Sequence, residues 1–163
     1  MTMAALATTT RAARADDTEW IRAMIPRLHA FGPPDYRSTA AMDGAEADAT
    51  VAAIAGGGLI GHRIVLVAED ASGARLGFVH VETAEDFFTH ERHGHVSTLV
   101  VAPEAEHCGI GRVLVNAAEA WTRDRGYRLL TLNVFDRNDA ARRLYERCGF
   151  AVDTIKYLKR LDR

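Results

Sequence analysis

Helix-like and strand-like patterns of apolar residues alternate along this chain. A threonine-rich run, Thr8–Arg14, predicts a first strand, and an apolar stripe at helical spacing predicts a helix over Thr18–Ala30. Pro26 lies inside that stripe, so we expect a kink or a break there. A second, alanine-rich helix is predicted over Ala45–Ala55. The glycine run Gly56–Gly58 that follows is interpreted as a flexible connector rather than a phosphate-binding loop, because no strand precedes it.

The second half of the chain has the stronger pattern. Two β-rich runs, Ile64–Glu69 and Leu76–Glu82, flank the turn residues Asp70–Gly73 and predict a hairpin. A polar connector, Asp86–His95, leads into Val96–Val101, an almost continuously apolar run typical of a strand at the centre of a sheet. A helix, a strand, a helix and a last strand are then predicted over Gly109–Arg125, Leu129–Phe135, Asp139–Cys148 and Ala151–Leu161. We therefore predict one α/β domain of the α+β type, spanning residues 1–163 around a mixed sheet.

Composition narrows the classes of function that fit. A chain of 163 residues can bury a core without disulfides, and its formal net charge of −2 argues against a nucleic-acid binder. Cys108 and Cys148 are far apart and form no C-x-x-C pattern, so we expect a reducing, cytoplasmic location. No apolar run reaches the roughly 18 to 20 residues of a membrane helix. Met1–Thr10 lacks the basic start of a signal peptide.

The run from Val100 to Arg112 carries the most specific chemistry. A buried strand ends before Pro103, and after a tight turn Gly109 and Gly111 open a helix. Glycines let a ligand approach the backbone closely, and the unpaired amides and dipole of a helix start attract an anion such as pyrophosphate. Taken alone, this glycine pair fits equally well with a helix start that simply packs tightly on a strand. The dinucleotide fingerprint G-x-G-x-x-G is not met, because its third position is Leu114.

Two motifs in this half resemble a known family. The run Val-Ala-Pro-Glu-x-x-x-x-Gly-Ile-Gly-Arg resembles the acetyl-CoA-binding motif of the GNAT superfamily of N-acetyltransferases. Residues Asn138–Phe150 resemble its second signature, N-x-x-A-x-x-L-Y-E-x-x-G-F. The resemblance extends from about Ile64 to the C-terminus. It implies a single-domain GNAT-like fold, in which a mixed, mostly antiparallel central sheet contains a splayed pair of parallel strands and is flanked by helices.

The resemblance also implies roles for individual residues. The main chain that would pair with the pantetheine arm of acetyl-CoA belongs to Leu99, Val100 and Val101. The turn whose amides would hold the pyrophosphate consists of His107, Cys108, Gly109, Ile110, Gly111 and Arg112. Asn138 would contact the co-substrate near its thiol. Tyr145 would act as the general acid that protonates the departing thiolate, for which a phenol with an ordinary pKa near 10 is suitable.

The motif leaves the general base open. Asn133 stands where some relatives that modify protein N-termini carry a glutamate, and an amide takes up no proton. His95 matches the base of members resembling histone acetyltransferases and, with an ordinary pKa near 6.5, is the predicted base. A polar role at the strand entry is the alternative for His95, and Glu82, His80 or solvent are further candidates for the base.

Two features of the same region bear on binding. Glu106 stands where this motif normally has Gln or Arg, so we expect CoA binding to be intact but weaker. His90, His93 and His95 alternate along the connector, but no cysteine completes a recognisable ligand set, and we expect no metal.

These observations predict an N-acetyltransferase that moves the acetyl group of acetyl-CoA to a primary amine by direct attack in a ternary complex. A non-catalytic acyl-CoA-binding or sensor module of the same fold is the alternative. Glu106 and Asn133 favour that alternative, whereas Tyr145 and Asn138 argue against it.

The acceptor is expected to be a small-molecule or peptide amine, and neither nucleic acid nor a membrane is an expected partner. Its pocket would be formed by the first helices, the Phe31–Thr39 loop and Glu82–His95. The acidic residues there favour a cationic acceptor: Asp35, Glu82, Glu85 and Asp86. The resemblance is also compatible with a homodimer.

Overall fold

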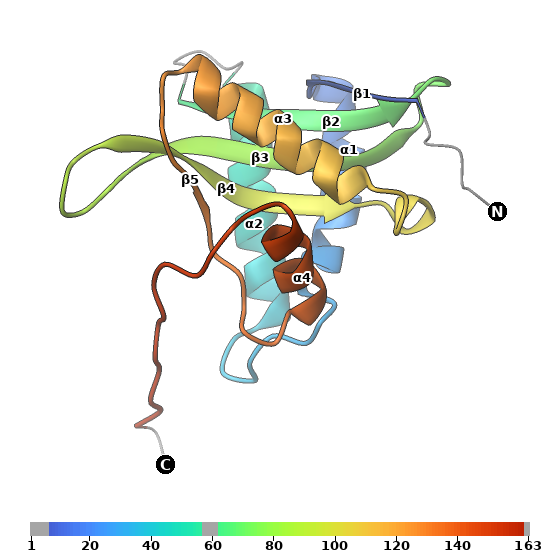
Figure 1. The fold of residues 1–163 in the computed structure, drawn as a ribbon. Helices are drawn as coiled ribbons and strands as arrows, with labels where there is room; N and C mark the ends of the chain where they lie inside the picture. The colour runs from blue at the N-terminus through green and yellow to red at the C-terminus, as the bar shows by residue number, and fades with distance from the viewer. Residues whose placement is uncertain (1–6, 57–61, 162–163) are drawn as a thin grey trace.

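The computed structural model describes residues 7–56 and 62–161, which build one five-stranded sheet with helices on both faces (Figure 1). The strands are β1 (Thr8–Ala12), β2 (Arg63–Asp70), β3 (Arg75–Glu85), β4 (Arg92–Val101) and β5 (Leu130–Leu132). They lie in sequence order, antiparallel from β1 to β4, and β5 is parallel to β4. The predicted mixed, mostly antiparallel sheet is thus confirmed.

The helices lie in two layers. Their bounds are α1 (Thr18–Met24), α2 (Thr39–Ala55), α3 (Ile110–Asp124) and α4 (Asp139–Arg147), with short 3-10 turns η1 (Ala15–Asp17), η2 (Ile25–His29) and η3 (Pro103–Ala105). Figure 1 shows α1 and α2 behind the sheet, α3 across its front and α4 below β4. The break predicted at Pro26 is confirmed, since α1 ends at Met24 and the chain continues as η2. Within the described ranges, none of these helices combines the length and apolarity needed to cross a membrane.

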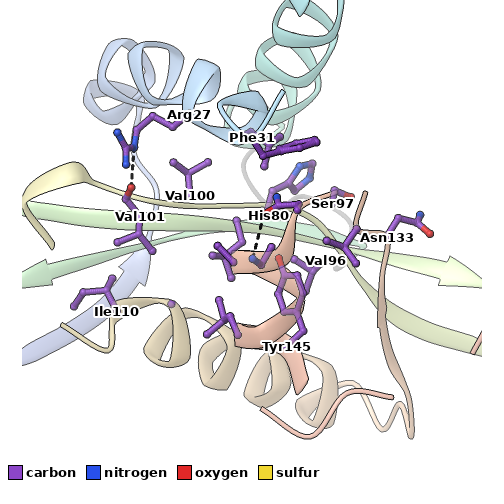
Figure 2. A pocket seen from close by; sticks show the side chains of 18 of the residues that line it. Arg27, Phe31, His80, Val96, Ser97, Val100, Val101, Ile110, Asn133 and Tyr145 are labelled. Carbon is purple, nitrogen blue, oxygen red and sulfur yellow. Dashed lines mark hydrogen bonds between the residues drawn. The ribbon is translucent and has the colours of Figure 1, made fainter. Parts of the chain in front are cut away.

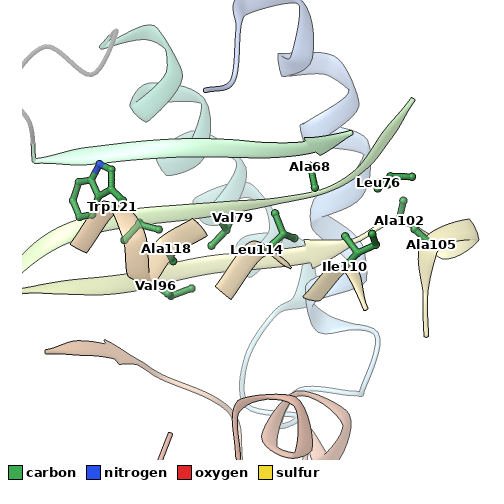
Figure 3. Packing of buried hydrophobic residues seen from close by; sticks show 11 residues of the cluster. Ala68, Leu76, Val79, Val96, Ala102, Ala105, Ile110, Leu114, Ala118 and Trp121 are labelled. Atoms are coloured by element: carbon green, nitrogen blue, oxygen red, sulfur yellow. The ribbon is translucent and has the colours of Figure 1, made fainter. Parts of the chain in front are cut away.

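Each face of the sheet has its own apolar core. The stripe of α3 that contains Ile110, Leu114 and Ala118 packs against Val79 and Val96 on the front face (Figure 3). On the back face, residues of α1 and η2 pack against β2 and β3; these are Ile21, Ile25, Val65, Val67 and Phe78. Full burial of one such side chain stabilises the fold by about 1.5–3 kcal/mol, so the two layers hold the central strands firmly.

A buried ion network joins the start of α1 to the sheet. Asp17 is fully buried, and its carboxylate accepts hydrogen bonds from Arg11 at 2.7 Å, from Arg75 at 2.7 Å and from the backbone N–H of Arg14 at 2.8 Å. Burial alone would raise the pKa of Asp17, but these hydrogen bonds hold it well below its ordinary value. The paired charges thereby fix the position of α1 on β1 and β3.

Several boundaries differ from the predicted ones. Helix α2 begins at Thr39 rather than Ala45, because the Ser38 hydroxyl accepts a hydrogen bond from the Ala41 N–H and caps the helix. The connector predicted over Asp86–His95 was wrong in its second half: β3 extends to Glu85, which pairs with Arg92, so β4 starts there. Strand β5 is also shorter than predicted.

The last strand, predicted over Ala151–Leu161, was wrong. In the part of the chain that the structure describes, this segment contains no strand, and every one of its residues is exposed. The chain leaves α4 through Gly149, in a left-handed conformation, and runs away from the sheet (Figure 1). A strand needs a neighbouring strand for its backbone hydrogen bonds, and no strand of the described sheet pairs with this segment. Two interpretations concern segments that lie partly outside the described residues: the absence of a signal peptide at Met1–Thr10 and the flexible connector at Gly56–Gly58.

Candidate active site

The sheet opens between β4 and β5. These strands pair over three positions, Gly94 with Leu130 to Val96 with Leu132, and β4 then continues alone on that side to Val101. Backbone groups of β4 beyond Val96 therefore face the opening with no strand of the described residues opposite them, as the splayed parallel pair predicts. One of them is already used, because the Val101 carbonyl accepts a hydrogen bond from Arg27 Nε at 3.1 Å.

A β-bulge lies at the mouth of this opening. His80 pairs with Thr98 and Val81 with Val96, so Ser97 is an extra residue on β4. Consecutive hydroxyls are thereby held by carboxylates from two different elements. The Thr98 hydroxyl donates to Glu46 of α2 at 2.8 Å, and the Ser97 hydroxyl donates to Glu82 of β3.

The glycine turn leads from β4 into α3. His107 and Gly109 have left-handed φ angles of 60° and 83°, which turn the chain sharply before Ile110. The first amides of α3 precede the helical hydrogen-bond ladder, whose first donor is Arg112 N–H to Gly109 O. A Cβ at Gly111 would lie 2.8 Å from Leu144 Cδ2, so this glycine lets α3 pack closely on α4. Among the described residues, the N–H groups of Gly109, Ile110 and Gly111 have no backbone acceptor, so the turn presents these amides beside a helix contact.

An ion pair compensates the negative charge of Glu106. Its carboxylate forms an ion pair with Arg27 of η2, the same guanidinium that donates to the Val101 carbonyl. Both side chains line the cavity described below. The pair therefore neutralises the acidic residue that the motif comparison identified as unfavourable for a pyrophosphate.

Helix α4 supplies Asn138 and Tyr145. Asn138 caps the helix, since its side-chain oxygen accepts a hydrogen bond from the Ala141 N–H at 3.2 Å. Tyr145 points from α4 toward β4 (Figure 2), and its ring packs edge-on against Phe150 at 5.7 Å between centroids. Burial raises the pKa of Tyr145 to about 12, so its hydroxyl is protonated at neutral pH and can donate a hydrogen bond.

Histidines from β3 and β4 lie on the same side of the sheet. His95 Nδ1 is 2.8 Å from the Thr131 hydroxyl of β5, and burial lowers the pKa of His95 despite the nearby Glu82. Burial likewise lowers the pKa of His80. Both ring nitrogens of His80 are buried, and neither has a hydrogen-bond partner among the described residues. Buried polar atoms normally have a hydrogen-bond partner, so we expect a ligand or a water molecule to bind the His80 nitrogens.

One cavity of about 1120 Å3 joins these parts. Most residues predicted to bind the co-substrate or to act in catalysis line it: Leu99, Val100, Val101, His107, Gly109, Ile110, Gly111, Arg112, Asn138, Tyr145 and His95. Cys108 lies in the same turn, but its side chain packs against the front core instead.

The acidic lining differs from the predicted one. Glu82 lines the cavity as expected, whereas Asp35, Glu85 and Asp86 are not part of its wall. Glu46, together with Arg27 and His29, had not been singled out from the sequence. In residues 7–56 and 62–161, no group of three or more His, Cys, Asp or Glu side chains converges as metal ligands would.

Comparisons with known proteins agree with this geometry. The model of the acetyltransferase (GNAT) family matches residues 17–150, which include both motifs and confirm the resemblance. The chain is 28% identical over 144 residues to the uncharacterized N-acetyltransferase YhfO of Bacillus subtilis, covering 88% of this chain and 90% of that protein. It is 37% identical over 138 residues to a mycothiol acetyltransferase of Salinispora tropica, covering 84% of this chain but 42% of that longer protein.

Solved structures share the fold. A GCN5-related N-acetyltransferase from Ralstonia eutropha superposes with a TM-score of 0.73 at 24% identity, over 93% of this chain and 97% of that one. The structure of AAC(6')-Iy in complex with the bisubstrate analog CoA-S-monomethyl-acetylneamine superposes with a TM-score of 0.66 at 20% identity, over 94% and 98%. The predicted α+β architecture is therefore confirmed.

Proposed function

Because this chain belongs to the acetyltransferase (GNAT) family, we propose that it transfers the acetyl group of acetyl-CoA to a primary amine by direct attack in a ternary complex. One observation carries the proposal: a single cavity joins the open side of β4, the amides at the start of α3 and the hydroxyl-bearing side chain of Tyr145. These are the three requirements for binding a thioester of CoA and releasing its thiol.

The binding half of the proposal rests on main-chain groups. Leu99–Val101 offer a strand edge to the amide-containing pantetheine arm, and the turn His107–Arg112 offers amides and a helix dipole to the pyrophosphate. The neutral ion pair of Arg27 and Glu106 removes the repulsion that Glu106 alone would exert. Acetyl-CoA, when bound, supplies the activated acyl group.

In the transfer step, a C–N bond to the amine forms while the C–S bond of the thioester breaks. The amine loses a proton, which we assign to His95, directly or through a water molecule. Its lowered pKa keeps this imidazole neutral and able to accept a proton at neutral pH. The departing thiolate gains a proton from Tyr145. The raised pKa of Tyr145 keeps the phenol protonated, so its hydroxyl can donate a hydrogen bond to the departing sulfur.

Glu46, Glu82 and Arg63 line the acceptor end, so two carboxylates outnumber one guanidinium there, which supports an amine that carries a second positive charge. Glu46 and Glu82 each use one carboxylate oxygen for Thr98 or Ser97, which leaves the other oxygen for a ligand. His80 pairs with Thr98 in the sheet register and lies two residues before Glu82 on β3; of its two ring nitrogens, unpartnered among the described residues, one can accept a hydrogen bond and the other can donate one. A diamine or a basic peptide terminus matches this arrangement.

The direct experiment measures thiol release from acetyl-CoA with a panel of amines, together with CoA binding by calorimetry. We expect turnover with some amines, and a loss of about 100-fold or more in kcat for Tyr145→Phe with CoA affinity unchanged. Tyr127→Phe is the matched control, since that phenol bonds to Thr83 outside the cavity. CoA binding without turnover of any amine would refute the proposal and support a non-catalytic acyl-CoA-binding module.

The acceptor class is tested separately. Glu46→Gln or Glu82→Gln should raise KM about tenfold or more for a diamine, since a hydrogen bond to a charged group contributes about 1.5–3 kcal/mol. KM for an amine without a second charge should change much less. Glu119→Gln is the control, because that carboxylate pairs with Arg123 and neither side chain lines the cavity. Equal changes in KM for both classes of amine would contradict a cationic acceptor.

A further inference from the structure

Arg63, the first residue of β2, is a cation at the acceptor end of the cavity. Its side chain forms no hydrogen bond or ion pair with another residue in the part of the chain that the structure describes. A guanidinium carries five N–H donors in a planar fork that matches the two oxygens of a carboxylate. Arg63 is therefore available to an anionic group of a ligand.

The surroundings of Arg63 position its guanidinium and leave its donors free. Glu82 lies directly opposite on β3, but its carboxylate accepts a hydrogen bond from the Ser97 hydroxyl of β4. On the other side, Nη2 of Arg63 lies 3.4 Å from the position that a Cβ would take at Gly56, the C-cap of α2. The C-terminal end of a helix carries a partial negative charge, which favours a cation there. The guanidinium is thus held where α2 ends and β2 begins, at the wall of the cavity.

His80 is a second polar group beside Arg63. Since Arg63 stands opposite Glu82, and His80 lies two residues before Glu82 on β3, His80 is the diagonal neighbour of Arg63 on one face of the sheet. Burial lowers the pKa of His80 most, and the charge of Arg63 lowers it further. His80 lines the cavity (Figure 2) and is only 3% exposed, yet both ring nitrogens lack a partner among the described residues. One nitrogen of a neutral imidazole carries a hydrogen, so His80 can donate to the same anion as Arg63.

Three kinds of chemical group follow one another across the sheet at this end. Arg63 of β2 pairs with Glu82 of β3, and Glu82 pairs with His95 of β4. All three side chains line the cavity. Neighbouring strands lie about 4.8 Å apart, so the backbones of Arg63 and His95 are about 10 Å apart. A ligand that lies across these strands meets the proposed base, then a carboxylate, then a guanidinium.

We propose that Arg63 and His80 form a carboxylate-binding subsite, and that the acceptor is an α-amino acid with a second amine on its side chain. The side-chain amine lies at His95, the α-ammonium group at Glu82, and the α-carboxylate at Arg63 and His80. The acetyl group moves to the side-chain nitrogen as the C–S bond of the thioester breaks, and the α-amine and the carboxylate stay unchanged. This assignment rests on the proposed function and narrows its acceptor to one class.

The free amino acid fits this row of charges better than the other amines do. A simple diamine satisfies Glu82, but its second ammonium group then lies next to the guanidinium of Arg63, which repels it. A lysine inside a polypeptide has neither a free α-ammonium group nor a free α-carboxylate. The amino acid places each of its charges beside a group of opposite sign, and it gives the guanidinium a charge-assisted hydrogen bond.

The first experiment measures binding without turnover, by calorimetry on the whole chain saturated with CoA. Lysine, lysinamide and cadaverine share one terminal amine, but only lysine has the carboxylate; ornithine and putrescine repeat the comparison with one carbon fewer. At least one of the two amino acids should bind about tenfold or more tightly than its diamine. Arg63→Gln should remove this preference and lower Kd for the diamine, whose second ammonium is no longer repelled, and Arg63→Lys should retain part of the preference. Arg128→Gln is the matched control, since this exposed arginine pairs with Glu91 outside the cavity. Equal Kd values for the amino acids and their diamines, or an equal loss of both in Arg63→Gln, would overturn the proposal.

A second experiment uses acetyl-CoA and separates the subsite from the proposed function. The product should carry its acetyl group on the side-chain nitrogen, as fragmentation in a mass spectrometer shows, and Arg63→Gln should lower kcat/KM for the amino acid about tenfold or more. Acetylation of the α-amine would overturn the proposed orientation. Turnover of amines with no preference for a carboxylate would refute the subsite and leave the proposed function intact. Binding that depends on Arg63 without turnover of any amine would support the subsite and refute the proposed function.

Discussion

Neutralising Arg27 should weaken CoA binding, and neutralising Glu106 in the same chain should restore it. The two side chains form an ion pair beside the turn that is proposed to hold the pyrophosphate. In Arg27→Gln the carboxylate of Glu106 is left without its counter-charge, whereas in Glu106→Gln an uncompensated guanidinium remains.

The magnitude follows from Coulomb's law. At an effective dielectric constant near 20, one unit charge acts on another somewhat more than 10 Å away with about 1 kcal/mol, or about a fivefold change in Kd. Arg27→Gln should therefore raise Kd for CoA about fivefold, and Glu106→Gln should lower it by a similar factor. The double variant should bind as the unaltered protein does. Because the pair is partly exposed, these factors should shrink above 0.1 M salt, where the Debye length is about 10 Å.

Calorimetric titration of CoA at low and high salt measures the four affinities. Arg22→Gln is the matched control, since it removes an arginine of α1 whose partner, Asp48, lies on α2 outside the cavity. If the double variant binds as weakly as Arg27→Gln, charge compensation is refuted. Arg27 would then act through its hydrogen bond to the Val101 carbonyl.

Three further predictions concern stability and pH. Gly77→Ala should lower the free energy of unfolding in urea by about 1–3 kcal/mol, because its Cβ would lie 2.6 Å from the Val100 carbonyl oxygen; an unchanged midpoint would contradict this contact. Asp17→Asn should cost about 3–5 kcal/mol at pH 7. Since the folded pKa of Asp17 is lowered, its stabilisation is present above pH 4 and disappears as the pH falls further; an equal deficit at pH 3 would refute the network. For His95 as base, kcat/KM should decline only below pH 6.5, because burial lowers the pKa of His95, and His95→Gln should abolish that limb; its persistence would assign the proton to His80 or solvent.

Local signals predicted much of the fold. The apolar stripe of α3 and the break at Pro26 depend on neighbours a few positions away, and both are present in the structure. The start of β4 and the short β5 depend on pairing partners that are distant in sequence, and both were misjudged. The last strand failed for the same reason, since a run of strand-forming residues does not specify a neighbouring strand with which it can pair.

The candidate site shows the same difference between local signals and contacts that are distant in sequence. Tyr145, Asn138 and the glycine turn could be predicted as site residues because each lies in a contiguous motif. Arg27 was missed because it meets Glu106 across 79 positions of sequence, and Glu46 because it meets Thr98 across 52. Neither residue lies in a motif of its own, and only the packing of η2 and α2 against β4 gives them a role.

The opening between β4 and β5 has a consequence for which molecules can add to the sheet. A strand edge that offers free hydrogen-bonding groups invites any extended chain to add to it, which is the first step of aggregation. Here the free stretch of β4 lies inside the cavity, bounded by Leu144 and Tyr145 of α4, rather than at the rim of the sheet. Helix α4 and the start of α3 therefore limit access to these groups to molecules that fit the cavity. The position of the opening between β4 and β5 thus determines which molecules can form hydrogen bonds with the free stretch of β4.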